Sequence, residues 1–153
     1  MNNTSSLLWT FPQASQVQVT TKINPNNNYQ TISKDFIEKY ASAITFGINC
    51  AEYYYSSNAS VSLHIHQGSN NYLHEIIGHA NFKNKLSEFN INVIKFSNLV
   101  YTSQPVGKNS ILLIFNGKAD INNNTFTIIN TFVLRIINGS PKIMNQVFEI
   151  FTP

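Results

Sequence analysis

Residues 125–137, TFTIINTFVLRII, decide the fold, because they are apolar on both faces of an extended strand. Successive side chains of a strand point to opposite faces. By that alternation the two faces carry Phe126, Ile128, Phe132, Leu134 and Ile136 on one side, and Ile129, Thr131, Val133, Arg135 and Ile137 on the other. A half-solvated antiparallel strand would be polar on one of them. The stretch therefore predicts a strand that is covered on both sides.

The stretches around this strand repeat its pattern. Residues 110–121, SILLIFNGKADI, and residues 142–151, KIMNQVFEIF, are also extended and apolar on two faces. The separators, NNN at 122–124 and NGSP at 138–141, have the turn chemistry of hairpins. A fourth extended run, residues 91–102, precedes them and ends near a Pro-Val-Gly turn. The second half of the chain is thus predicted to be an antiparallel meander of four strands.

The first half of the chain is predicted to be mainly helical. Residues 32–48 place apolar side chains at helical spacing, and shorter helices are expected over residues 50–55 and 81–89. Between them, residues 60–67 alternate apolar and polar side chains as a strand does. Helices followed by a meander indicate an α+β domain, with three N-terminal helices packed on one face of a strongly curved antiparallel sheet.

Those helices can cover only one face of the sheet, so the other apolar face needs a second cover. We expect a neighbouring molecule to supply it, in a homodimer or a heterodimer formed sheet to sheet. The alternative is that the N-terminal arm folds back over this face with Leu7, Leu8, Trp9 and Phe11.

Length and composition bound the protein further. Its 153 residues suit one domain, with a flexible arm over residues 1–28 and the folded domain over 29–153. Only 11% of residues are charged, the net charge is +3, and no Lys/Arg cluster marks a nucleic-acid surface. No apolar run is long enough to cross a membrane. The lone Cys50 and the absence of a signal-like N-terminus predict the nucleus or cytosol.

Five short motifs, in order, resemble the nuclear transport factor 2-like domain family. They run from about Tyr29 to Phe151. The first is the helix Ile32-Ser-Lys-Asp-Phe-Ile-Glu-Lys-Tyr40, and the second is Gly78 with Phe82 and Leu86. The others are Asn116-Gly117, Asn130-Thr-Phe-Val-Leu134 and Asn145-Gln-Val-Phe148. Each motif is weak alone, and their order gives the resemblance its weight.

The resemblance implies a cone-shaped domain that encloses an apolar cavity and dimerises through its outer sheet face. When the family's positions are matched to this sequence, and combined with the alternation of strand faces, the resemblance places Tyr40, Phe132 and Phe148 at the cavity. It places Tyr29 where an aromatic side chain binds Phe-Gly nucleoporins. The implied dimer interface contains Leu112, Ile114, Ile129, Thr131, Val133, Val147 and Glu149.

The function implied is that of a non-catalytic nucleocytoplasmic transport adaptor, closest to the small mRNA-export cofactor that pairs with a larger export receptor. Its expected locations are the nucleus, the cytoplasm and the nuclear pore. Carriage of Ran-GDP is an alternative, but the family's acidic cavity mouth is reduced here to Asp120 and Glu75.

Catalytic and metal-binding patterns are weak. The sequence His74-Glu-Ile-Ile-Gly-His79 resembles a zinc protease motif, but its histidines are one residue too far apart. His64 and His66 share one strand face without a third ligand fixed nearby. Tyr40, Tyr54, His64 and Asp120 are the pieces available to a ketosteroid isomerase-like pocket enzyme or small-ligand binder. We expect no catalytic residues, no metal and no cofactor.

Overall fold

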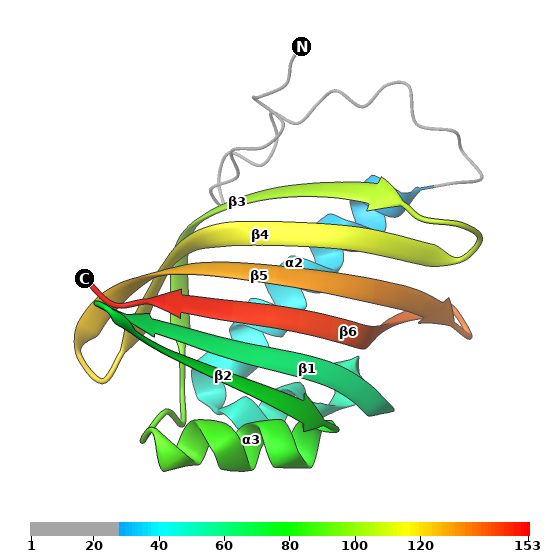
Figure 1. Cartoon of the computed structure of the whole chain (residues 1–153). Helices are drawn as coiled ribbons and strands as arrows, with labels where there is room; N and C mark the ends of the chain where they lie inside the picture. Colours follow the sequence, from blue (N-terminus) through cyan, green and yellow to red (C-terminus); the bar gives the residue numbers. More distant parts are fainter. Residues whose placement is uncertain (1–27) are drawn as a thin grey trace.

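The protein, described by a computed structural model over residues 28–153, forms one curved six-stranded sheet (Figure 1). The expected arm therefore lies, apart from Asn28, outside the described residues. The strands stand in the order β2-β1-β6-β5-β4-β3. Their bounds are β1 Tyr55–Gln67, β2 Asn70–Ile77, β3 Lys95–Pro105, β4 Ser110–Ile121, β5 Asn124–Ile137 and β6 Ser140–Phe151.

The sheet is mixed, which corrects the prediction of a purely antiparallel one. β1 and β6 pair in parallel, whereas the other neighbouring strands pair antiparallel. The parallel pair arises because β6, at the end of the meander, returns to the first strand of the domain. Such a pairing between distant segments leaves no local periodicity in the sequence.

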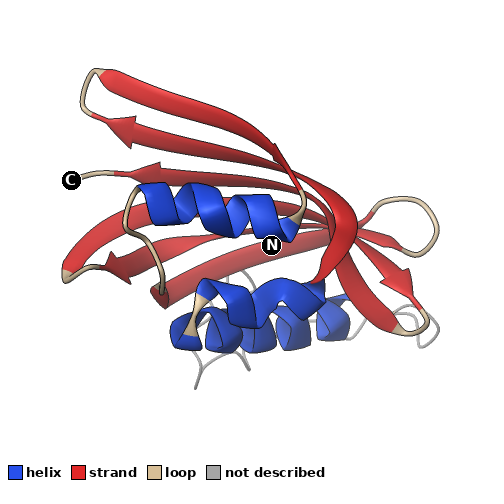
Figure 2. Ribbon diagram, turned by 90° about the horizontal axis from the view of Figure 1, so that it is seen from below, coloured by secondary structure: helices blue, strands red, loops and turns tan. Residues whose placement is uncertain are grey.

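Three helices of the described chain pack on one side of this sheet (Figure 2). They are α2 Tyr29–Phe46, the 3-10 helix η2 Ile48–Tyr54 and α3 His79–Glu88. The prediction that all three are N-terminal is wrong, because α3 follows β1 and β2. Strand β2 itself was not predicted. It is an edge strand that buries only Ile76, so it lacks a clear alternation.

The hairpins of the meander form where the sequence predicts them, and asparagine makes them possible. Asn122 and Asn123 have φ of 52° and 67°, and Asn138 and Gly139 have φ of 52° and 80°. Two successive residues with positive φ are the mark of the hairpin turn whose twist matches the strands, and asparagine and glycine tolerate it best. β4 spans the predicted residues, and β5 and β6 each begin slightly earlier than predicted.

Strand β3 begins later than predicted and contains a bulge between Ser97 and Val100. Residues 91–94 are irregular, although Ile91 and Ile94 are buried. The bulge brings the strand backbone against Gly117 of β4: a Cβ atom there would lie 2.7 Å from the Asn98 carbonyl oxygen. Glycine at this position thus permits the bend that curves the sheet around α2.

The core lies between the helices and the inner face of the sheet. Helix α2 buries Phe36, Ile37, Tyr40, Ala41 and Ile44, the apolar positions that defined it in the sequence. The Phe36 and Phe132 rings meet edge to face with centroids 5.5 Å apart. The opposite, outer face of the sheet carries none of these three helices (Figure 2).

Candidate functional site

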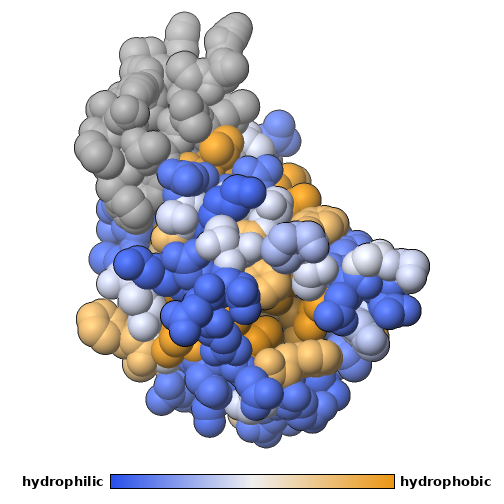
Figure 3. Space-filling view, turned by 90° about the vertical axis from the view of Figure 1, so that its left-hand side faces the viewer, coloured by the Kyte–Doolittle hydropathy of each residue, from blue (hydrophilic) through white to orange (hydrophobic). Residues whose placement is uncertain are grey.

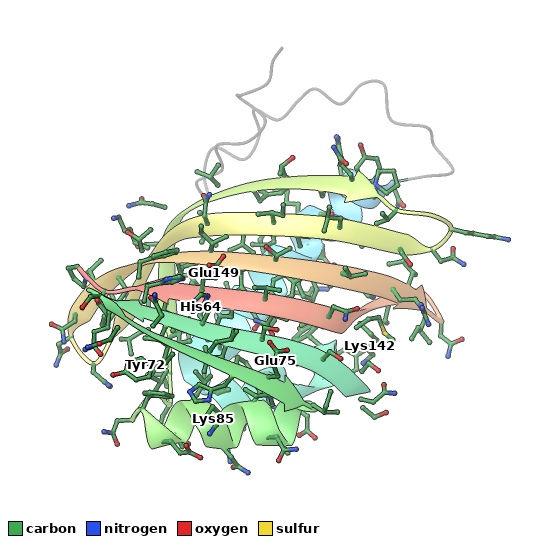
Figure 4. The ribbon with its side chains drawn as sticks, viewed as in Figure 1. His64, Tyr72, Glu75, Lys85, Lys142 and Glu149 are labelled. Atoms are coloured by element: carbon green, nitrogen blue, oxygen red, sulfur yellow. The ribbon has the colours of Figure 1, made fainter. Side chains whose placement is uncertain are left out.

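The outer face of the sheet, turned away from the helices, faces the viewer in Figure 4. Its apolar centre spans three neighbouring strands. Val147 of β6 lies in register with Thr131 of β5, which lies in register with Ile114 of β4. In the next row, Val133 of β5 is paired with Leu112 of β4. With Ile129, these residues are six of the seven predicted to form a dimer interface.

Most of this apolar centre is half-buried by its neighbours within the sheet, and Val147 is 41% exposed. Leu73 and Ile77 of the edge strand β2 are also on this face and are each 58% exposed, but the polar outer side chains of β1 separate them from Val147. The pairing of β1 with β2 brings these two residues opposite His64 and Ser60. The predicted residues are therefore contiguous on one accessible face, and the interface itself stays a prediction.

Glu149, the seventh predicted interface residue, lies on the same face between two histidines of β1. Its Oε1 atom is 3.1 Å from Nε2 of His66 and 3.8 Å from Nδ1 of His64. The sequence places the two histidines on one strand face but fixes no third ligand near them. Glu149 joins them only through the parallel pairing of β1 with β6, for which the sequence gives no signal.

A buried polar network crosses the interior behind this face. The Tyr55 hydroxyl donates to Oε1 of Gln146 at 2.6 Å and lies 2.7 Å from the Tyr40 hydroxyl. Gln146 Nε2 donates to Oδ1 of Asn130 at 2.8 Å. Burial raises the pKa of Tyr40 and of Tyr55 well above the usual value, so both hydroxyls stay protonated into the alkaline range.

The predicted cavity residues are part of the packed core. Tyr40, Phe132 and Phe148 are each about 1% exposed or less. Phe132 packs against Tyr40, and Phe148 packs against Phe82. Two pockets of the described chain lie elsewhere and do not include the three predicted residues.

The first pocket opens at the end of the domain near the C-terminus, where apolar side chains are visible inside a polar rim (Figure 3). Its volume is about 380 Å³, and its apolar lining includes Tyr72, Phe89 and Phe126. The second is a groove between η2, β1 and the start of α3, lined by Tyr55, His79 and others. His79 Nε2 lies 3.0 Å from the Ile48 carbonyl oxygen, and burial lowers the pKa of this histidine.

The four residues available for an enzyme site do not lie together in the structure. Tyr40 and Tyr54 lie on the helical side with ring centroids 6.3 Å apart, whereas His64 lies on the outer face. Asp120 is exposed near the end of β4 and accepts a hydrogen bond from Thr125. The protease-like motif is divided between two elements, because His74 belongs to β2 and His79 begins α3.

The remaining predicted residues also lie apart from one another. Tyr29 begins α2 and is half-buried against the core. Glu75 is on the outer face. The Ser62 hydroxyl donates to its two carboxylate oxygens, Oε1 at 3.1 Å and Oε2 at 3.2 Å. β2, which carries Glu75, and β4, which carries Asp120, are separated by three strands.

None of the helices in residues 28–153 combines the length and the apolar character that a membrane crossing requires.

Comparison with known proteins identifies the fold. No protein-family model matches the chain. An uncharacterized protein of Acanthamoeba polyphaga mimivirus is 27% identical over 161 residues, which cover 98% of this chain and 79% of that protein. Among solved structures, nuclear transport factor 2 of Cryptosporidium parvum has a TM-score of 0.66 at 20% identity, covering 84% of this chain and 97% of that one.

Other structures with the same fold carry different descriptions. A chain of the C. albicans Mtr2–Mex67 M domain complex has a TM-score of 0.64 at 10% identity, covering 81% of this chain and 95% of that chain. A provisionally assigned scytalone dehydratase of Novosphingobium aromaticivorans has a TM-score of 0.60 at 9% identity, covering 80% and 83%. The chain thus has a nuclear transport factor 2-like fold, which is found in transport proteins and in enzymes alike.

Proposed function

We propose that the protein is a non-catalytic adaptor that associates through the outer face of its sheet, with a second copy of itself or with a larger receptor. The observation that carries the proposal is the accessible apolar centre on β4, β5 and β6, where Val147 is 41% exposed. Association that covers an apolar surface spanning several strands is favourable, because it removes that surface from water.

The proposed setting is nucleocytoplasmic transport, and most closely mRNA export. The fold likeness to nuclear transport factor 2 and to a chain of the Mtr2–Mex67 complex supports this setting. The adaptor would act in the nucleus, the cytoplasm and the nuclear pore, and Tyr29 would contribute to Phe-Gly nucleoporin binding. No metal or cofactor is needed for this role.

The interior polar network favours this role over pocket catalysis. Its four side chains are two tyrosines and two amides, with no carboxylate or imidazole bonded to them in the described residues. A general acid or base near neutral pH needs a group that titrates there; a tyrosine ordinarily titrates near ~10, and burial moves the pKa of both hydroxyls still further from neutrality. Ran-GDP carriage is less favoured, because it relies in the family on an acidic cavity mouth. The two acids matched to that mouth, Asp120 and Glu75, lie on separate strands and form no cluster.

Size-exclusion chromatography with light scattering, over a range of concentrations, tests the association. We expect a dimer, or a complex once the purified receptor partner is added. Retention on immobilised Phe-Gly repeats, compared with repeats in which phenylalanine is replaced by serine, tests the nucleoporin role. A chain that stays monomeric with and without the partner, and that ignores the repeats, would contradict the proposal.

A further inference from the structure

The two histidines and the carboxylate on the outer face have the composition of a metal site. One possible ligand atom from each of His64, His66 and Glu149 lies within 4.8 Å of the other two, and Glu149 Oε1 is 3.8 Å from His64 Nδ1 and 3.1 Å from His66 Nε2. Figure 4 shows His64 and Glu149 side by side on β1 and β6. Each of the three atoms has a lone pair to donate when the imidazole nitrogen is unprotonated.

Hydrogen bonding alone does not use all three atoms. His66 and Glu149 are at hydrogen-bond distance, 3.1 Å. His64 Nδ1, at 3.8 Å from the same carboxylate oxygen, is too far away for a hydrogen bond. A proton can therefore join only two of the three atoms, whereas a cation between them can accept a lone pair from each.

The sheet holds the three side chains in place. His64 is in register with Glu149 across the parallel pair, and the two imidazole centroids are 3.8 Å apart. The His66 ring is stacked on Phe151 with an interplanar angle of 5°. The backbone carbonyl of His66 also accepts hydrogen bonds from the backbone N–H and the hydroxyl of Thr152. The ligands are therefore carried on paired strands and not on a loop.

We propose that His64 Nδ1, His66 Nε2 and the Glu149 carboxylate form a three-ligand site for a divalent transition-metal ion, with Zn²⁺ as the expected occupant. Two imidazoles and one carboxylate suit Zn²⁺, while Mg²⁺ and Ca²⁺ prefer oxygen ligands. Tetrahedral coordination at ~2.0–2.1 Å places neighbouring ligands ~3.3 Å apart. The three side chains are 24–28% exposed, which leaves them room to rotate toward that spacing.

The surroundings leave room for a fourth ligand. The site is on the outer face, so water or another solvent-side group can take the open position, as in three-ligand zinc sites generally. Two charged side chains on the same face have partners of their own. Glu75 is bonded by Ser62, and Lys118 donates to the Thr127 hydroxyl at 3.0 Å. The inference does not depend on the proposed adaptor function.

Metal titration of the untagged full-length chain tests the site. We expect calorimetry to detect one Zn²⁺ per chain, no Mg²⁺ binding, and visible d–d bands of four-coordinate Co²⁺ that Zn²⁺ displaces. Glu149→Gln and His66→Gln should each weaken Zn²⁺ binding at least ~10-fold, since even groups behind a ligand commonly matter by 10–100-fold. Glu75→Gln, a carboxylate change on the same face, should leave the affinity unchanged.

Circular dichroism and thermal unfolding of each variant establish that it is folded before its affinity is compared. A folded wild-type chain without Co²⁺ bands at one equivalent would overturn the site. So would a folded Glu149→Gln variant that binds Zn²⁺ as tightly as the wild type. The measurements use the chain alone, so their failure leaves the adaptor proposal standing, and failure of association leaves the metal site standing.

Discussion

Tyr55, at the start of β1, donates its hydroxyl hydrogen to Oε1 of Gln146 in β6 across 2.6 Å, in the buried centre of the domain. The two residues lie 91 positions apart, so the bond connects the first and last strands of the described domain. Gln146 also donates to Asn130, and through these contacts three strands share one polar centre. Buried polar groups of this kind are costly to leave unpaired.

Gln146→Leu should destabilise the protein by ~1–3 kcal/mol, the usual cost of leaving buried hydrogen-bonding groups unsatisfied. The leucine would leave Asn130 Oδ1 without the donor it has now. Urea unfolding monitored by circular dichroism gives the change in free energy. Asn145→Ala, at an exposed neighbouring position, is the control and should change stability by less than ~0.5 kcal/mol.

The protein should lose stability at alkaline pH. Burial raises the pKa of Tyr40 and Tyr55 in the folded state, so above about pH 10 the unfolded chain releases tyrosine protons that the folded chain retains. The free energy of unfolding should then fall by up to ~1.4 kcal/mol per pH unit for each tyrosine. Urea unfolding between pH 9 and pH 11, taken as ~1 unit either side of the ordinary pKa, measures the slope.

Tyr40→Phe should make this alkaline slope shallower. Phe36→Leu removes packing without removing a titrating group, so it should lower stability equally at each pH. Equal slopes in the wild type and Tyr40→Phe would contradict the explanation.

His79 should make the protein less stable in acid. Burial lowers its pKa in the folded state, so as the pH falls below ~6.5 the unfolded chain takes up a proton that the folded chain excludes. The stabilising effect is present above that pH and is lost below it. The free energy of unfolding of His79→Gln should therefore approach that of the wild type as the pH falls from 7 to 5, within ~1.5 units of the ordinary pKa. A constant difference in unfolding free energy would argue against this role.

Gly117→Ala should destabilise the protein by ~2 kcal/mol or more, in the range of overpacking changes. The added Cβ would lie 2.7 Å from the Asn98 oxygen and 2.8 Å from the Ser97 oxygen, both in the backbone of β3. Gly68→Asn is the matched control, because a Cβ at Gly68 meets nothing within 4 Å and asparagine tolerates its positive φ. Thermal unfolding of both variants compares them directly.

Val147→Glu should abolish association through the outer face, because it places an unpaired carboxylate at the centre of an apolar interface. A cost of ~3 kcal/mol would weaken the complex more than ~100-fold. Phe46→Glu, an equally drastic change at a 79% exposed position at the end of α2, should leave association intact. Light scattering measures both, and equal association by the wild type and Val147→Glu would show that another face is used.

The sequence by itself determined the elements whose periodicity is local. The apolar positions of α2, the two-faced strands β4, β5 and β6 and the asparagine turns between them follow from alternation and backbone preference. The same alternation separated Phe132, which is in the core, from Val147, which is on the outer face. These properties depend on residues within a few positions of one another, so they can be read without the fold.

Only the tertiary structure decided which distant segments meet. The edge strand β2, the parallel pairing of β1 with β6, the polar network of Tyr55 and Gln146, and the approach of Glu149 to His64 and His66 all depend on strand register. Register is a property of the whole sheet, set by burying its inner face against the helices. A one-residue shift between β1 and β6 would move Glu149 to a different neighbour while leaving every local pattern in the sequence unchanged.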